Sequence, residues 1–184
     1  MKIAIIIDSL RKGGKERRCL ELIYFLKSQQ AIDLHVYLID NIIDFEYYYN
    51  WNVSTTIIGR SNQRDLLVFY KLYRQLKSFK PDVIHSWGVM SSFYSIPSKL
   101  IISSFLVSSL IADSSKKFSS LSATGIMFKL TCIFADTILS NSNAGLEAYN
   151  LSKHKKAKVI YNGINLARFD STKTKEEIKK QLGI

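Results

Sequence analysis

The feature that most constrains the fold is an alternation of short apolar runs and amphipathic stretches along almost the whole chain. Residues 2–7 (KIAIII) form an unbroken, largely β-branched run, which is typical of a strand buried on both faces. Residues 15–29 then carry apolar side chains at helical spacing, as expected of a helix with one buried face. Because strand–helix–strand units cross over in one hand, this alternation predicts a mainly parallel sheet covered by helices on both faces. The sequence therefore predicts a doubly wound, Rossmann-like α/β fold.

The same pattern places the remaining elements. Further strands are predicted at residues 33–40, 55–58, 82–87, 105–112, 136–140 and 158–161, and further helices at residues 64–79, 121–134 and 143–150. A helix around Phe93, Ile96 and Leu100 contains Pro97, which implies either a start in its first turn or a kink. We expect residues 1–167 to form one domain. Residues 168–184, with a short helix at 174–182, would be a linker into a further domain, because another strand is expected where the sequence stops.

Composition excludes several classes of protein. Of the 184 residues, 47% are hydrophobic and 22% charged, which is inconsistent with intrinsic disorder. Two cysteines cannot support a disulfide scaffold and favour a reducing compartment, so a cytoplasmic location is expected. Residues 3–7 are too short an apolar run for a signal peptide. Residues 100–112 are the most apolar stretch, but they include four serines and fall short of the roughly 20 residues that a membrane-spanning helix needs.

The charge is strongly positive and unevenly distributed. The chain holds 26 Lys and Arg against 15 Asp and Glu, a formal net charge of +11. Residues 151–184 alone contribute 9 basic and 3 acidic side chains. Solvated helix faces and a solvated tail would explain this excess, and so would attraction to phosphorylated ligands or to the inner face of the plasma membrane. No nucleic-acid-binding module is recognisable, so nucleic acid is not an expected partner.

The loops that follow strands are the places to look for ligands, because a doubly wound sheet binds them beyond the carboxyl ends of its strands. The first loop contains neither GxGxxG nor a P-loop. Its adjacent Gly13 and Gly14 nevertheless precede a helix, where a ligand can approach the backbone and free N–H groups favour an anion. Arg11, Lys12 and Lys15 would add attraction. A purely structural turn is the alternative explanation.

A histidine and a tryptophan lie at the carboxyl end of a predicted central strand. Histidine side chains ordinarily titrate near neutrality, so His85 could act as a base or donate to a sugar hydroxyl, and Trp87 could supply an apolar wall for a sugar ring. The alternative is a buried histidine bonded to backbone beside a core tryptophan. Ser142 follows the sixth predicted strand and would cap the next helix whether or not it also binds a ligand.

Four segments together resemble the glycosyltransferase family 4 group. They are GGKER at 13–17, PDVIHS at 81–86, FADTILSNS at 134–142 and VIYNGINLARF at 159–169. They are similar, in that order and over nearly the whole chain, to the family's GGxER, PDVVHxH-type, aDxvixxS and VIxNGIDxxxF segments. The resemblance implies the N-terminal half of a GT-B enzyme, built from two facing Rossmann-like domains. In that family the N-terminal domain mainly holds the acceptor and the C-terminal domain mainly holds the nucleotide-sugar donor.

The resemblance also implies a mechanism and a set of site residues. Transfer would retain the anomeric configuration, with a nucleotide sugar as donor substrate and with no metal or cofactor. Backbone N–H groups at the glycine pair would stabilise charge on the leaving diphosphate. Many members carry a histidine after the fifth strand; here LIADSS at 110–115 has none, and Asp113 would either orient the acceptor or cap the loop. The candidate catalytic residues are His85 and Asp113, and the candidate binding residues are Gly13, Gly14, Lys15, Glu16, Trp87, Ser142 and Asn162.

Three functions are consistent with these features. The preferred one is the acceptor-side domain of a retaining glycosyltransferase for surface polysaccharide or lipid-linked oligosaccharide assembly, inactive without its donor domain. Its partners would be a nucleotide sugar, a sugar or lipid-linked saccharide acceptor and that C-terminal domain. The second is a non-catalytic α/β module that binds a phosphorylated ligand at Gly13-Gly14. The third is a scaffold that docks on a membrane.

Overall fold

The computed structural model describes residues 1–62, 65–110 and 122–163 and the single positions 176, 179, 181 and 183. Its strands are β1 (Lys2–Ile7), β2 (Asp33–Leu38), β3 (Ser54–Ile57), β4 (Val83–Trp87), β5 (Phe105–Ser109), β6 (Thr137–Ser140) and β7 (Ala157–Val159). Its α-helices are α1 (Gly14–Lys27), α2 (Leu67–Phe79), α3 (Val89–Ile102), α4 (Ala123–Phe134) and α5 (Asn143–Ala148). A 3-10 helix, η1, spans Glu46–Trp51. The predicted alternation of strands and helices is thus confirmed across the described residues.

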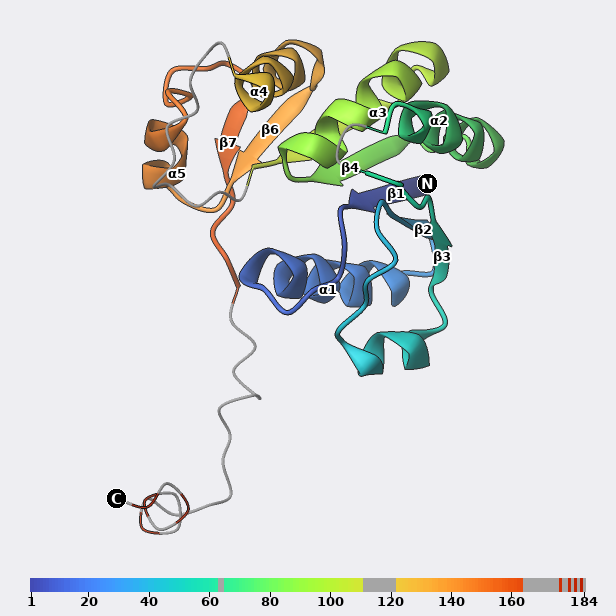
Figure 1. Ribbon diagram of the computed structural model, residues 1–184. Helices are drawn as coiled ribbons and strands as arrows, with labels where there is room; N and C mark the ends of the chain where they lie inside the picture. Colours follow the sequence, from blue (N-terminus) through green and yellow to red (C-terminus); the bar gives the residue numbers. More distant parts are fainter. Residues whose placement is uncertain are drawn as a thin grey trace.

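All these strands pair in parallel in a single sheet, in the order β3-β2-β1-β4-β5-β6-β7. The chain first builds outward from β1 to β3 and then returns to place β4 on the other side of β1. Helices α2, α3 and α4 cover one face of the sheet, and α1 with η1 lies on the opposite face (Figure 1). The predicted doubly wound Rossmann-like fold is confirmed.

The interior strand β1 separates two hydrophobic cores. Side chains alternate between the faces of a strand, so Ile3, Ile5 and Ile7 pack toward α1, whereas Ala4 and Ile6 pack toward the face covered by α2 and α3. These five side chains are at most 6% exposed. Burial on both faces explains why the strand is continuously apolar instead of alternating with polar residues.

Two features of the chain differ from the sequence prediction or were missed by it. Pro97 lies in the interior of α3, so a first-turn position for this proline is wrong. A proline there lacks the N–H for one helical hydrogen bond, and the packing of α3 against its neighbours α2 and α4 outweighs that loss. No element was predicted between residues 40 and 55, where the structure places η1. Tertiary contacts of its aromatic side chains fix this short helix, and such contacts leave no periodic signal.

Some predicted elements extend beyond the described residues. The strand predicted at 105–112 corresponds to β5, which ends at Ser109, and residues 111–121 lie outside the described part of the chain. The boundary proposed at residue 167 also falls outside it. In the predicted helix at 174–182, the described positions Glu176, Lys179 and Gln181 are helical. Among the described residues, no helix is both long enough and apolar enough to cross a membrane.

Candidate functional site

The winding of the sheet reverses between β1 and β4, and their carboxyl ends lie side by side. Ile7, the last residue of β1, pairs with Trp87, the last residue of β4. The chain leaves β4 through Gly88, whose φ of 104° lies in a region that side-chain-bearing residues rarely adopt. Such a reversal opens a crevice beyond the strand ends, where ligands of doubly wound folds bind. The candidate residues of the first loop and of β4 therefore lie at the same edge of the sheet.

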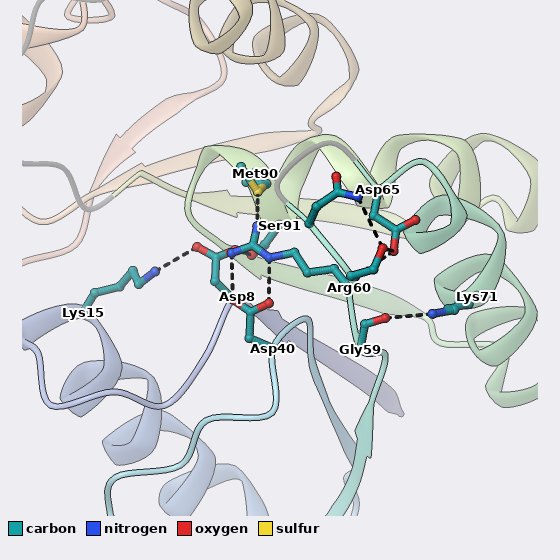
Figure 2. A network of polar contacts seen from close by, with 11 residues as sticks. Asp8, Lys15, Asp40, Gly59, Arg60, Asp65, Lys71, Met90 and Ser91 are labelled. Carbon is teal, nitrogen blue, oxygen red and sulfur yellow. Dashed lines mark hydrogen bonds and ion pairs between the residues drawn. The ribbon is translucent and has the colours of Figure 1, made fainter.

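Asp8, directly after β1, organises the polar contacts at this edge (Figure 2). Its carboxylate accepts hydrogen bonds from Lys15 Nζ, at 3.3 Å, and from the hydroxyl of Ser91 in α3. Lys15 Nζ also lies 3.4 Å from Glu16 Oε1. Asp8 thus joins the start of α1 to the start of α3, and the predicted ligand-binding Lys15 is engaged by two carboxylates of the protein.

A second ion pair ties the loops after β2 and β3 into this network. Arg60 donates from Nε to Asp40 Oδ1 at 2.6 Å and from Nη2 to Asp40 Oδ2 at 2.7 Å, and both side chains are about one-fifth exposed. The backbone N–H of Asp40 donates to Asp8 O at 2.7 Å. Bidentate pairing of a guanidinium with a carboxylate is the stronger kind of ion pair, so it holds these loops in a fixed arrangement.

Replacing Asp40 by Ala is expected to lower the free energy of unfolding by about 1–3 kcal/mol, because it leaves the half-buried Arg60 without its charged partner. Asp33→Ala is the matched control. Asp33 lies 3.8 Å from Lys2 in an exposed ion pair, which should contribute at most about 1 kcal/mol. Urea unfolding followed by circular dichroism measures both changes. Equal losses of unfolding free energy in the two variants would show that the Asp40–Arg60 pair stabilises the fold no more than the exposed Asp33–Lys2 pair.

The N-terminus of α1 begins immediately after the predicted glycine pair. Gly13 is the N-cap and has no side-chain cap, and only its carbonyl is engaged, by the N–H of Arg17 at 3.1 Å. A Cβ at Gly13 would lie 2.2 Å from Glu16 Oε2, so the Glu16 carboxylate rests against this glycine. A Cβ at Gly14 would meet nothing within 4 Å. The open approach to the backbone is therefore at Gly14, while Glu16 already places negative charge beside Gly13.

Gly13 and Gly14 line a groove of about 1100 Å³ between α1 and η1, which we call the α1 groove. It is lined by Lys12, Gly13, Gly14, Arg17, Leu20, Glu21, Tyr24, Phe45, Tyr47, Trp51 and Gly163. Its walls combine aromatic rings with charged side chains of both signs. It starts at the sheet edge and follows the side of α1, so a ligand at the glycine pair can continue along the helix.

His85 and Trp87 line a neighbouring cavity of about 290 Å³, which we call the β4 cavity. The other residues that line it are Arg18, Glu21, Leu22, Ser109, Leu139, Ser140, Asn141, Ile160, Tyr161, Asn162 and Gly163. The two cavities share Glu21 and Gly163, so they adjoin. Arg18 Nη1 donates to Gly163 O at 2.8 Å and connects α1 to the segment after β7. The glycine pair and His85 thus face adjoining cavities, as the prediction of one shared site requires.

Burial governs the chemistry of His85. Desolvation lowers the pKa of its imidazole to about 4, so the ring is neutral at pH 7. Nε2 lies 2.8 Å from Ser109 Oγ, and the ring lies 5.1 Å from that of Trp87. The polar partner of His85 Nε2 is thus a hydroxyl group instead of the backbone, whereas Trp87 is only 6% exposed and packs in the core, as the structural alternative expects. A neutral imidazole can accept a proton or donate a hydrogen bond, but its catalytic role stays a prediction.

The remaining candidates differ in their surroundings. Ser142 Oγ accepts from Gly145 N at 3.0 Å and caps α5, as expected, and its predicted ligand contact stays a prediction. Asn162 lines the β4 cavity. Asp113 lies outside the described residues. Within the described residues, no cluster of three or more His, Cys, Asp or Glu side chains could hold a metal ion.

The Asp8–Asp40–Arg60 network and the aromatic wall formed by η1 were not predicted from the sequence. Asp8 could have been found, because it is the first polar residue after a buried strand and so falls at a carboxyl end. Arg60 and the η1 aromatics follow an edge strand and a loop, where no motif or period marks them. Only the folded chain brings them to the site.

A family model described as Glycosyltransferase Family 4 matches residues 12–168. The chain belongs to this family. The match contains the segments of this chain that resemble the family, and the last of them extends one residue past its end. These segments are residues 13–17, 81–86, 134–142 and 159–169. No relative among the curated proteins matches the chain.

Solved structures similar to this Family 4 chain support the GT-B assignment of its fold. Anabaena Alr3699/HepE in complex with UDP matches with a TM-score of 0.79 and 19% identity, over 100% of this chain and 50% of that chain. The lipopolysaccharide outer core galactosyltransferase WaaB matches with a TM-score of 0.65 and 17% identity, over 90% and 47%. UDP-GlcNAc 2-epimerase from Methanocaldococcus jannaschii matches with a TM-score of 0.62 and 16% identity, over 87% and 45%. The Family 4 chain thus spans about half the length of these proteins.

Proposed function

We propose that this chain is the acceptor-side domain of a retaining glycosyltransferase that uses a nucleotide sugar. The observation that carries the proposal is the pair of adjoining cavities at the carboxyl edge of the sheet, with Gly14 open at the start of one and neutral His85 in the other. Backbone N–H groups at Gly14 would face the donor diphosphate, and the α1 groove would hold the acceptor. The product would be a surface polysaccharide or a lipid-linked oligosaccharide.

The donor side of the reaction would come from a second domain. The present chain matches half of Anabaena HepE, which was solved in complex with UDP and glucose and with UDP-glucose. A uridine diphosphate sugar is therefore the donor class that we propose. Fold alone does not choose this reaction, because an epimerase shares it, and family membership favours transfer.

The alternative of a module that binds a phosphorylated ligand at Gly13-Gly14 has less support. Glu16 places a carboxylate against Gly13, and Lys15 is paired with Asp8 and Glu16. An anion held by this domain alone would meet negative charge and would lack a free Lys15. A glycosyltransferase needs only weak contacts here, because the second domain would supply the remainder of the diphosphate site.

A chimera tests the proposal. The present chain is fused to the C-terminal half of Anabaena HepE, and release of UDP from UDP-glucose is measured with a panel of polyprenyl-diphosphate-linked saccharides as acceptors. We expect release by the chimera at least tenfold above that by the chain alone, which should be inactive because half of the cleft is missing. Robust transfer by the isolated chain would overturn the two-domain account. So would a chimera that binds UDP-glucose but transfers to no acceptor.

Gly14→Ala separates a ligand-binding role of the glycine from a structural one. Apart from its chain neighbours and the backbone of its own helix, the added methyl group meets nothing within 4 Å, and alanine in place of glycine generally stabilises a helix by a few tenths to about 1 kcal/mol. We expect the chimera carrying Gly14→Ala to be at least as stable as the parent but to transfer at least tenfold more slowly. Unchanged transfer would mean that no ligand approaches this position.

A further inference from the structure

We propose that the α1 groove binds an acceptor saccharide of two or more sugar rings, with the ring farthest from the reaction lying on Tyr24, Tyr47 and Trp51. These three side chains are called the aromatic platform. The proposal rests on the proposed function and names the class of acceptor. It makes the platform the part of this chain that distinguishes an extended glycan from a single sugar.

Tyr24 lies on α1, and Tyr47 and Trp51 lie on η1. These two helices lie on the same side of the sheet (Figure 1). The ring centroids of Tyr24 and Trp51 lie 5.2 Å apart, and those of Tyr47 and Trp51 lie 5.4 Å apart. Tyr24 is 61% exposed and Tyr47 is 45% exposed, although both line the groove. Aromatic faces present an apolar surface with a polar hydroxyl at the edge, which suits the apolar face and the hydroxyl rim of a sugar ring.

The platform is held in place by buried neighbours. Tyr48 is 4% exposed, and its hydroxyl lies 2.7 Å from Thr55 Oγ1 at the start of β3. Phe45, just before η1, is also buried and packs with its ring 5.6 Å from that of Tyr47. Lys27 at the end of α1 donates from Nζ to Trp51 O. A binding surface fixed before the ligand arrives loses less conformational entropy on binding.

The length of the groove indicates that the ligand is extended. Gly14 and Tyr24 are ten residues apart on one helix, which corresponds to about 15 Å at a rise of 1.5 Å per residue. A single sugar at the glycine pair cannot also reach the platform. Between these ends the groove is lined by Arg17 and Glu21, which offer N–H donors and a carboxylate acceptor, as the hydroxyls of a sugar chain require.

Exposed aromatic side chains inside and outside the groove allow a bound glycan to be distinguished from a lipid surface. Phe25 follows Tyr24 in the sequence, and Tyr49 lies between Tyr47 and Trp51 on η1. Both are about 60% exposed, but they do not line the groove. A membrane would engage exposed aromatics in general, whereas a saccharide in the groove would engage only those that line it. The same residues provide matched controls: Phe25→Ala for Tyr24→Ala on α1, and Tyr49→Ala for Tyr47→Ala on η1.

The test measures glycan binding by the chain itself, without donor or catalysis. Parent and variants are applied to a glycan array that holds monosaccharides and oligosaccharides, and affinities for the best ligands are then measured by saturation-transfer NMR. We expect binding of oligosaccharides but not of their monosaccharides. Tyr24→Ala and Tyr47→Ala should weaken binding at least tenfold, Phe25→Ala and Tyr49→Ala less than twofold, and Tyr47→Phe, which keeps the ring, should retain most of it. Circular dichroism checks that each variant is folded.

Several results would overturn the proposal. These are equal binding of monosaccharides, absence of glycan binding, or oligosaccharide binding that survives Tyr24→Ala and Tyr47→Ala. Binding to phosphatidylglycerol vesicles that depends on Phe25 and Tyr49, without glycan binding, would assign the aromatic surface to a membrane instead. The proposed function fails separately: platform-dependent glycan binding with an inactive chimera would leave a saccharide-binding site in a protein that is not this transferase.

Discussion

Lowering the pH from 7 to about 4.5 is expected to remove roughly 2 to 3 kcal/mol of folding free energy through His85 alone. Burial lowers the pKa of this imidazole to about 4 in the folded chain, against about 6.5 when it is exposed on unfolding. Between these values the unfolded chain binds more protons than the folded one, so protonation favours unfolding. The stabilising contribution is complete above pH 6.5 and is lost as the pH falls toward 4.

Urea unfolding at pH 7 and pH 4.5 measures this effect, with His85→Gln as the control. Glutamine keeps a polar group near Ser109 Oγ, which lies 2.8 Å from His85 Nε2, but it does not titrate. The difference between the two pH values should therefore be roughly 2 kcal/mol or more larger in the parent chain than in the variant. Burial also lowers the pKa of His35, but this contribution is common to both proteins and cancels. An equal pH effect in parent and variant would show that His85 is not desolvated in solution.

Ile5→Ala is expected to cost about 2–5 kcal/mol of unfolding free energy, which would take much of the stability of a domain this size. Ile5 lies in the interior strand β1, is fully buried and packs in the core on the α1 face of the sheet. Alanine removes three carbon atoms and leaves a cavity. This cavity cannot close, because β1 is held by β2 on one side and by β4 on the other. Urea or thermal unfolding at pH 7 measures the loss.

Ile57→Ala is the matched control for Ile5→Ala. Ile57 is the same residue type in the same kind of element, but it lies on the edge strand β3 and is 44% exposed. Its truncation removes less buried apolar surface and should cost about 1 kcal/mol or less. Equal losses in the two variants would contradict the sheet order, because they would place both isoleucines in equally buried positions.

In the candidate site, the sequence predicts which residues lie at the strand ends, but it does not predict which side chains contact one another. Gly13, Gly14, His85 and Trp87 were predicted because each follows or ends a strand, and the parallel sheet brings all such ends to one edge. Lys15 and Glu16 were placed in the same segment, but their engagement with Asp8 and Gly13 depends on side-chain contacts that no spacing reveals. For the same reason, the sequence could not show that His85 is neutral.

Sequence alone determined the class of fold and the family. The fold class follows from apolar periodicity, which is local because burial of one helix face or of both strand faces imposes it on residues close in sequence. The family follows from the order of the four similar segments, which can be read along the chain without knowledge of tertiary contacts. Only the tertiary structure decided that η1 packs beside α1, that Arg60 meets Asp40, and that two cavities share Glu21 and Gly163. These contacts join residues far apart in the chain, and their energies come from packing and desolvation, which exist only once the sheet has brought the segments together.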